Sequence, residues 1–549
     1  MLENHKGVRY ATTFREQITL RGMVIGSMGA IILTMSSMYV ALKLGALPWP
    51  IIFVALVSMF CLKVLGGTNI NEINVTHTAM SAGAMTAGGL AFTIPGIYML
   101  EPEAEISIPV LFFVVLAGVI LGLIFTALIR KYFVVTKALP YPMGQAAAET
   151  LIIGDEGGKK STTLFSALGI AALFTVLRDW FNVIPPTIMN SSLLNRGVYG
   201  GVWLSPMLIA VGYIIGPLFI GVWFLGAVIG DFGIVLGGTA RGWWDADTAS
   251  NIKASLGIGL MVGTGIAIIV KGIIPKAKEI FGPMISKGAI SGGFVNLRWA
   301  PLGMVILAVI FTTVCDMGVA ASIITILGVW LATSMSAQIV GQSGINPMEV
   351  FGIIVLLAAK AVSHLGHTET FFVAAVVAIA CGLAGDIMND FKAGYILNSD
   401  PKAQWMGECI GGVIGSFVSV GVFYVILTAY GPTAFGNPEY FTAPQAGMVA
   451  AMVGGIPHMT SFLTGLVLGC LLYVVNFPVM TLGLGVYLPF YLSATAFIGG
   501  ALKFIVQKAA PEWDKQGDGM IIASGLLGGE AVVGVIIALI QAVQGISAL

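Results

Sequence analysis

The chain has 549 residues, of which 57% are hydrophobic and only 9% are charged, and its formal net charge is zero. Soluble globular chains carry about 25% charged residues, so this composition excludes a soluble fold. The neutral balance, with no basic tract interleaved with aromatic residues, also argues against nucleic acid as a partner.

A polar leader, residues 1–20, opens the chain. It contains Lys6, Arg9 and Arg15, and Arg21 follows directly. Because no small-residue cleavage site follows the first apolar run, we expect a cytoplasmic leader rather than a signal peptide.

Long apolar runs follow from end to end, at residues 22–42, 106–129, 205–236 and 519–549 among others. Runs of at least about 18 apolar residues are long enough to cross a bilayer as helices. Strands of a membrane barrel would instead be about 10 residues long with alternating polarity. The sequence therefore predicts an all-α polytopic membrane protein.

Residues 66–95 are long enough to span, yet they are rich in glycine, amide and hydroxyl residues. Lipid does not tolerate such a surface, and non-helical backbone at membrane depth survives only inside protein or along a watery cavity. We expect a broken helix here whose side chains offer donors and acceptors to a polar substrate. The expected substrate-binding residues are Asn71, Asn74, Thr76 and His77.

A second interruption, Pro140-Tyr-Pro-Met-Gly-Gln145, leads into an alanine-rich segment with Glu149. Helix breaks expose backbone N–H and C=O groups that can hold charged ends of a ligand. We therefore add Tyr141 and Gln145 to the expected substrate-binding residues.

Loop charges give a topology. Basic residues are typical of cytoplasmic loops. Arg130, Lys131 and Lys137 then mark an inner loop, and the acidic loop from Glu101 to Glu105 lies outside. Counting from a cytoplasmic start gives roughly eight spans before a basic linker, by hydropathy windows of about 19 residues.

The second half of the chain repeats the first. The Ile-Asn pair at Asn71 recurs at Asn346, 275 residues later, and Leu20-Arg21 recurs at Leu297-Arg298. Duplicated halves are typical of secondary transporters, whose sites lie at broken helices between the repeats. We expect two parallel pseudo-symmetric transmembrane repeats, residues 21–274 and 298–549, joined by a cytoplasmic linker, residues 275–297.

The equivalent polar break in the second repeat is residues 338–349, where Gln342 and Asn346 are expected to bind the substrate and to face the first break. A further interruption is expected at Gly385–Tyr395. It is either part of the site or a cytoplasmic turn with solvated charges.

Placing a carboxyl group inside a membrane costs free energy, so such groups typically have a functional role. We expect proton coupling at Glu72, Glu149 or Glu530, in that order; Glu530 has the alternative of a hydrogen bond to a neighbouring helix. The five cysteines stand singly, and the cluster from His364 to Glu369 is typical of an exposed loop, so no metal site is predicted.

Four stretches together resemble the oligopeptide transporter (OPT) family, in particular a prokaryotic member related to its yellow-stripe-like branch. They are the break at Asn71, Tyr141-Pro-Met-Gly-Gln-Ala-Ala-Ala-Glu149, Asp386-Ile-Met-Asn-Asp-Phe-Lys-Ala-Gly-Tyr395, and Ala523-Ser-Gly-Leu-Leu-Gly-Gly-Glu530. The resemblance implies about sixteen helices and proton-driven uptake of small peptides or metal chelates.

The expected function is therefore a proton-coupled symporter that imports small oligopeptides or peptide-like compounds across the inner membrane, with both termini cytoplasmic. An importer of iron or nickel chelates of an amino-acid-derived ligand is the alternative. A polytopic membrane enzyme ranks lower, because no paired acidic motif, zinc-protease motif or serine–lysine dyad is present. No cofactor is expected besides the proton gradient, and the assembly, with a homodimer among the options, is left open.

Overall fold

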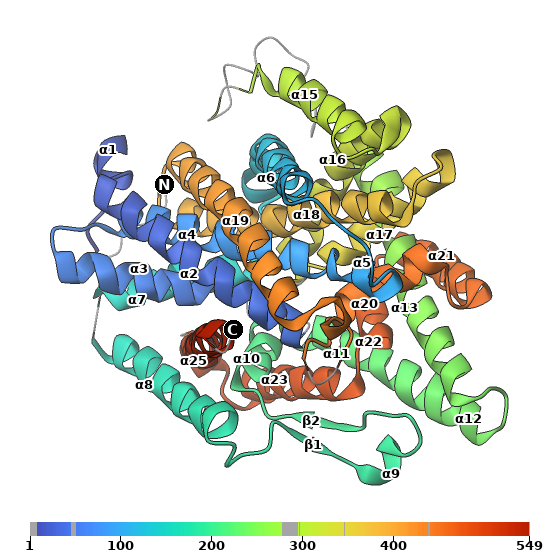
Figure 1. Ribbon diagram of the computed structural model, residues 1–549. Helices are drawn as coiled ribbons and strands as arrows, with labels where there is room; N and C mark the ends of the chain where they lie inside the picture. Colours follow the sequence, from blue (N-terminus) through green and yellow to red (C-terminus); the bar gives the residue numbers. More distant parts are fainter. Residues whose placement is uncertain are drawn as a thin grey trace. The chain divides into compact units, whose positions relative to one another are not determined.

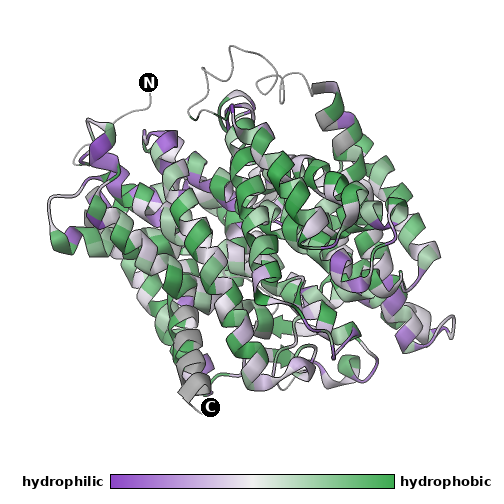
Figure 2. Ribbon diagram, turned by 45° about the horizontal axis from the view of Figure 1, so that its top comes forward, coloured by the Kyte–Doolittle hydropathy of each residue, from purple (hydrophilic) through white to green (hydrophobic). Residues whose placement is uncertain are grey.

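The computed structural model describes residues 8–44, 51–156, 158–276, 295, 297–344, 346–437, 440–515 and 517–547. These residues are helical almost throughout, and the strands among them form one short hairpin. Nine of the described helices are long and apolar enough to cross a membrane. Figure 2 shows hydrophobic residues along most of their length. The all-α polytopic membrane class is confirmed, and the count of sixteen helices stays a prediction.

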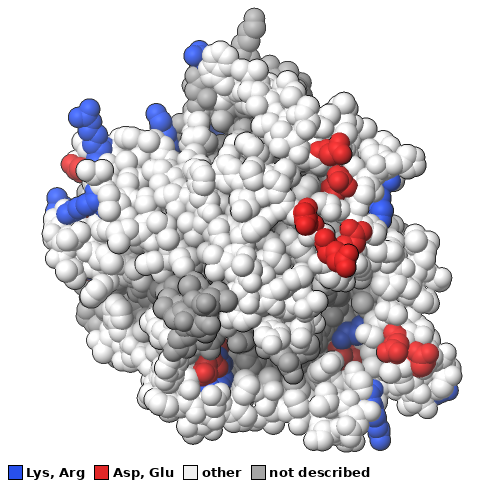
Figure 3. Space-filling model, viewed as in Figure 1, with Lys and Arg blue, Asp and Glu red and all other residues white. Residues whose placement is uncertain are grey.

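The surface fits that class. On the face shown in Figure 3, Lys, Arg, Asp and Glu side chains form separate patches on a mostly uncharged surface. Many large apolar side chains are exposed, including Phe60, Leu218 and Val467. An exposed apolar surface of this extent needs a non-aqueous surrounding, which lipid provides.

The chain divides into two compact units. Unit 1 consists of Met1–Glu156, Lys276–Gly454 and Val535–Leu549, and unit 2 of Gly157–Pro275 and Gly455–Gly534. Each unit therefore takes chain from both predicted repeats. The repeat boundaries at 21–274 and 298–549 stay a prediction, and most of the linker 275–297 lies outside the described residues.

Unit 1 is a helical bundle. Its elements are α1 (Phe14–Gln17), α2 (Leu20–Leu44), α3 (Ile51–Leu65), α4 (Ile70–Ala91), α5 (Pro95–Leu100), α6 (Ile108–Arg130), η1 (Lys131–Thr136), α7 (Pro142–Glu156), α15 (Ala300–Thr313), α16 (Gly318–Ser343), α17 (Met348–Val362), α18 (His367–Ile396), α19 (Pro401–Tyr430), η6 (Pro432–Ala434) and α20 (Pro444–Gly454). The core of the bundle contains α4 and α18 (Figure 1), around which α2, α6, α16, α17 and α19 pack.

The two polar breaks are shorter than the sequence predicts. Gly66 and Gly67 have φ values of +72° and +64° and end α3, because glycine adopts the left-handed conformation at low cost. The Asn69 side chain then caps α4 by accepting from the Glu72 N–H. The expectation of a broken helix throughout residues 66–95 is thus wrong beyond this junction: the chain runs as one buried helix from Ile70 to Ala91.

The break of the second half lies where it was expected, between the end of α16 and the start of α17, and Gly344 there has a φ of +71°. The interruption expected at Gly385–Tyr395 is absent, because α18 is continuous from His367 to Ile396. The polar residues of this segment lie on a continuous helix and are buried against neighbouring helices; they do not form a solvated turn.

Unit 2 is a smaller helical bundle with one antiparallel hairpin, in which Thr187 pairs with Trp203. Its elements are α8 (Gly158–Thr175), η2 (Val176–Trp180), β1 (Thr187–Met189), α9 (Ser191–Leu194), β2 (Gly201–Trp203), α10 (Pro206–Ile215), α11 (Pro217–Ala227), η3 (Val228–Gly237), α12 (Gly238–Ala240), α13 (Ala246–Ala267), η4 (Ile268–Ile273), η5 (Ile274–Lys276), α21 (Met459–Val474), α22 (Val479–Tyr487), α23 (Phe490–Ala509), α24 (Pro511–Lys515) and the first part of α25 (Asp518–Ser547). α13 packs along α21 and α22, and α10 along α23.

Candidate functional site in unit 1

Two neighbouring helices at the core of unit 1 carry an unusual number of polar residues. Every residue of α4 is buried, and α18 is buried from Thr370 to Gly394. Buried polar groups are costly unless another group satisfies them. The buried polar residues are Asn71, Glu72, Asn74, Thr76, His77, Thr78, Ser81 and Thr86 on α4 and Thr370, Asp386, Asn389, Asp390 and Lys392 on α18.

A stripe of glycines brings a third helix, α19, against α4. Gly407, Gly411 and Gly415 lie four residues apart and so share one face of α19. A Cβ atom at Gly411 would lie 2.0 Å from the carbonyl oxygen of Ala79. Small residues at this spacing let two membrane helices approach closely. Glu408, next to Gly407, is thereby carried into the polar core.

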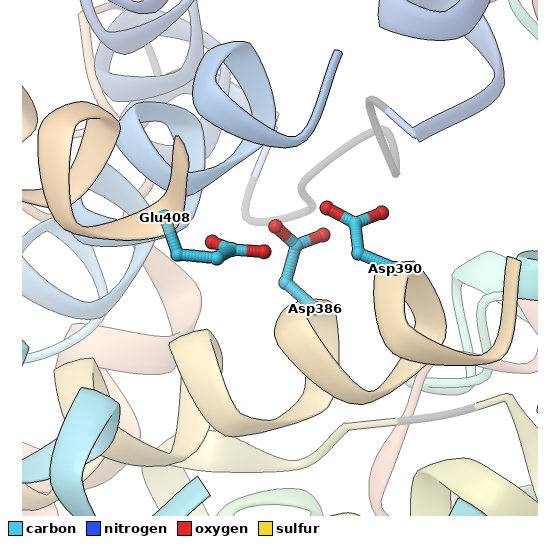
Figure 4. A group of neighbouring side chains, drawn as sticks. All are labelled: Asp386, Asp390 and Glu408. Atoms are coloured by element: carbon cyan, nitrogen blue, oxygen red, sulfur yellow. The ribbon is translucent and has the colours of Figure 1, made fainter. Parts of the chain in front are cut away.

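Three carboxyl groups meet there. Asp386 and Asp390 lie one turn apart on α18, and Glu408 projects from α19, as Figure 4 shows. One oxygen of each lies within 4.8 Å of the others, and all three residues have 0% exposed surface. Asp386 lies between the other two, and the Glu408 carboxyl group points toward it (Figure 4). We name Asp386, Asp390 and Glu408 the acid trio.

The three acids differ in their partners. Asp390 accepts a hydrogen bond from the Ser81 hydroxyl at 3.0 Å, and its other oxygen lies 3.1 Å from Nε2 of His77. No oxygen of Asp386 or Glu408 has a hydrogen bond to a described residue, and neither has Nδ1 of His77. Among the described residues, no lysine or arginine forms an ion pair with the trio. An ionised carboxylate buried in this way is strongly unfavourable, so the trio needs protons or a cation.

Asparagines at the start of α4 connect it to the turn between α18 and α19. The Asn71 amide donates to the Leu397 carbonyl at 2.8 Å and to the Ser399 hydroxyl at 3.0 Å. The Asn74 amide donates to the same hydroxyl at 3.0 Å. The side-chain amide oxygen of Asn74 and the hydroxyl of Thr76 have no hydrogen-bond partner among the described residues. Asn71 is therefore fully engaged within the protein, whereas Asn74 and Thr76 retain unused polar atoms.

Comparison with known proteins identifies the family. The sequence model described as "OPT oligopeptide transporter protein" matches residues 17–541, nearly the whole chain. The chain belongs to the OPT family. As a member of that family, it is a transporter and not an enzyme.

Relatives of this OPT protein carry two kinds of name. A protein of Haemophilus influenzae named "Putative oligopeptide transporter" is 26% identical, over 92% of each chain. A rice protein named "Probable metal-nicotianamine transporter YSL6" is 22% identical, over 96% of this chain and 92% of its own. Similarity to an Arabidopsis thaliana protein named "Probable metal-nicotianamine transporter YSL4" covers 80% of this chain at 22% identity.

The carboxyl groups proposed from the sequence for proton coupling occupy very different surroundings. The Glu72 carboxylate accepts two bonds of 2.7 Å from the Arg21 guanidinium and further bonds from two threonine hydroxyls. Glu149 is exposed on α7. Glu530, in unit 2, is paired with Arg178 at 2.9 Å and also accepts from Ser205 and from the Met207 N–H. Their coupling roles stay predictions.

The expected substrate-binding residues of this OPT protein lie in two separate regions: one at the start of α4, which includes Asn71, and one around the end of α16, which includes Asn346. Asn71 contacts Leu397, whereas the Asn346 amide donates to the Cys381 carbonyl at 2.8 Å. Those two carbonyls are sixteen residues apart in the sequence, which is about 24 Å along the α18 axis at 1.5 Å per residue. The expectation that the two breaks face each other is therefore wrong.

The second region lies around the end of α16. Tyr141 is fully buried; its hydroxyl donates to the Ala337 carbonyl and its backbone N–H to the Gly341 carbonyl. Gln342 is exposed nearby in sequence, and Gln145 is half-buried on the first turn of α7. Asn74, Thr76 and His77 lie in the first region, on α4, where His77 contacts Asp390 of the acid trio. The substrate-binding roles of all these residues stay predictions.

The sequence did not single out the acid trio as a site. The signal was present: two aspartates four residues apart inside a 30-residue apolar helix, and a glutamate inside a run of spaced glycines. Residues four apart share a helix face. The prediction of an interruption at Gly385–Tyr395 placed the two aspartates in a break, and so it missed that they share one face of a continuous helix.

Proposed function

We propose that this protein is a proton-coupled symporter that imports small oligopeptides or peptide-like compounds across the inner membrane, with both termini in the cytoplasm. The name of the Haemophilus influenzae relative, which matches 92% of this chain, supports the peptide class. The basic leader and basic inner loops support the orientation, since cytoplasmic loops are enriched in Lys and Arg.

The observation that carries the proposal is the unsatisfied polar core of unit 1. Peptides carry N–H and ammonium donors, and the buried side-chain oxygens of Asn74, Thr76 and Gln404 have no hydrogen-bond partner among the described residues. Unpartnered buried acceptors are rare in proteins and are candidates for a ligand's donors. Titratable groups beside them support coupling to protons, because ionisable residues inside a membrane typically mark proton or substrate pathways.

Purified protein in liposomes tests the proposal. Labelled di- to pentapeptides and glutathione are added outside, with the outside more acidic than the inside. We expect accumulation above the outer concentration, and a protonophore should reduce it to equilibration. Counterflow exchange in vesicles preloaded with unlabelled peptide checks that a carrier is at work. If none of these peptides enters faster than into empty liposomes, the peptide assignment is wrong.

Import of metal chelates is the second candidate. The rice relative that aligns with 96% of this chain is named as a metal-nicotianamine transporter, which favours a metal complex of an amino-acid-derived ligand. Iron or nickel chelates offered to the same vesicles distinguish the two. Uptake of a chelate that peptides do not inhibit would replace the peptide proposal by this one.

A further inference from the structure

We propose that the acid trio is the site where this transporter binds its driving protons. In the conformation described, Asp386 and Glu408 each carry a proton, and Asp390 lies beside Ser81 and His77. This inference rests on the proposed proton-coupled function and gives that function a location.

Burial and partner counts separate the three acids. Asp390 already has a polar partner at each oxygen: the Ser81 hydroxyl donates to one, and Nε2 of His77 lies 3.1 Å from the other. Asp386 and Glu408 have none among the described residues. Like charges within 4.8 Å of one another cannot all persist away from water. Protonation removes two of the three charges and gives two carboxyl groups a proton to donate.

The geometry also supplies acceptors for those protons. One oxygen of Glu408 lies within 4.8 Å of an oxygen of each aspartate, so acceptors lie close to a proton on Glu408. Asp386 lies between the two (Figure 4). A neutral carboxyl group has an O–H donor that the ionised form lacks. A protonated member of the trio can therefore donate toward a neighbouring carboxyl group, which an ionised member cannot do.

The charged groups on the surrounding helices differ in their partners. His77 of α4 contacts the trio through Asp390, and Cys409 follows Glu408 on α19. Groups with a described partner include Glu72 of α4 with Arg21 of α2, Arg130 of α6 over the Phe391 ring, Asp155 of α7 with Lys63, Lys360 of α17 with the Val453 carbonyl, Lys402 of α19 over the Phe14 ring, and His367 of α18 with Glu101. Further charged groups on the packed elements are Glu149 of α7, Lys131 of η1 and Lys137 directly after it, Glu369 and Lys392 of α18, and Glu349 of α17, whose Oε2 has no hydrogen-bond partner among the described residues.

His77 of α4 contacts the trio through Asp390. Its side chain is completely buried, with Nε2 on Asp390 and Nδ1 without a partner among the described residues. His77 therefore connects Asp390 to a second ring nitrogen that has no hydrogen-bond partner among the described residues.

A metal ion suits the trio less well. Calcium takes six to eight oxygen ligands, and magnesium keeps several of its waters in an octahedral shell. The trio offers three carboxyl groups with no exposed surface, and both oxygens of Asp390 already have polar partners.

Infrared difference spectroscopy tests the protonation state directly, on purified protein in lipid. Protonated carboxyl groups absorb separately from carboxylates, and the band shifts in heavy water. We expect this band in the wild type at neutral pH, and a loss of intensity in Asp386→Asn and in Glu408→Gln. The matched controls are Asp316→Asn and Glu103→Gln, which alter exposed acids of the same unit and should leave the band unchanged. A wild type without the band overturns the inference, whatever the transport assays give.

Transport assays test the coupling. Asp386→Asn and Glu408→Gln should reduce uptake driven by an inward proton gradient to the level without a gradient, whereas the two controls should match the wild type. Normal gradient-driven uptake in both trio variants overturns the inference. A wild type that carries no peptide or chelate contradicts the proposed function instead. Stoichiometric retention of added Mn²⁺ by the wild type, lost in both variants, would show a metal site and overturn the proton assignment.

Discussion

Replacing Gly411 by alanine should separate α19 from α4 and destabilise unit 1. The added Cβ atom would lie 2.0 Å from the Ala79 carbonyl oxygen and close to the Ala82 side chain. The obstacle is backbone, which cannot rotate away as a flexible side chain can. The two helices must therefore move apart by roughly 1 Å or more to restore an ordinary contact distance.

The expected magnitude follows from two opposing effects. Overpacking of a close interface typically costs about 1–3 kcal/mol. Alanine in place of glycine inside a helix is favourable by up to about 1 kcal/mol. Gly421, on the same helix, has nothing within 4 Å of its added Cβ, so its replacement shows the helix effect alone. The two variants should then differ by about 1–3 kcal/mol in stability, since the helix gain is common to both.

Heating of the purified variants in detergent measures this difference. Membrane proteins often unfold irreversibly, so the comparison uses midpoints at one fixed heating rate. Gly411→Ala should lose its native state at a lower temperature than the wild type, and Gly421→Ala at the same or a higher temperature. Equal midpoints for the two variants would refute the close approach of α19 to α4.

Three further outcomes follow from single contacts. Glu72→Gln should lower stability by about 1 kcal/mol, measured as a lower heating midpoint, since its arginine partner is partly solvated; gradient-driven uptake retained in this variant would count against a coupling role for Glu72 and favour the acid trio. Glu530→Gln should cost more, about 2 kcal/mol, because buried Glu530 loses charge-assisted hydrogen bonds from Arg178, Ser205 and the Met207 N–H, although Arg178 keeps its pair with Asp179; a heating midpoint equal to that of the wild type would contradict this. Hydrogen bonds from Thr248 hold the pKa of Asp245 below its usual value. The Asp245 cap of α13 is therefore fully effective at pH values above the normal aspartate pKa, and it weakens as the pH falls through the lowered pKa. Asp245→Asn should remove this acid dependence from the hydrogen-exchange rates of the first turn of α13.

Composition was sufficient to predict the fold class, because a chain with so few charged residues can keep its apolar surface away from water only as a set of membrane-spanning helices. It was insufficient for the helix breaks. The glycines at 66–67 and 344 mark real junctions, since their positive φ angles are a local property. The polar run after Asn69 is helical because its partners are distant in sequence: the Leu397 carbonyl and the Ser399 hydroxyl satisfy Asn71. Local composition cannot reveal such partners.

The same limit applies to the choice between buried acids. Glu72 and Glu530 resemble Asp386 and Glu408 in the sequence, as single carboxyl groups among apolar and small residues. In the structure, the first two each bind an arginine, whereas the second two lie with Asp390 within 4.8 Å and form no ion pair with a lysine or arginine that the structure describes. Two unit charges at that distance repel by about 3.5 kcal/mol at an effective dielectric constant of 20. An acid paired with arginine keeps its charge and holds helices together, whereas an unpaired acid among other acids is stabilised by taking up a proton. Proton exchange is therefore expected where cations are missing, and that distinction depends on contacts across α4, α18 and α19.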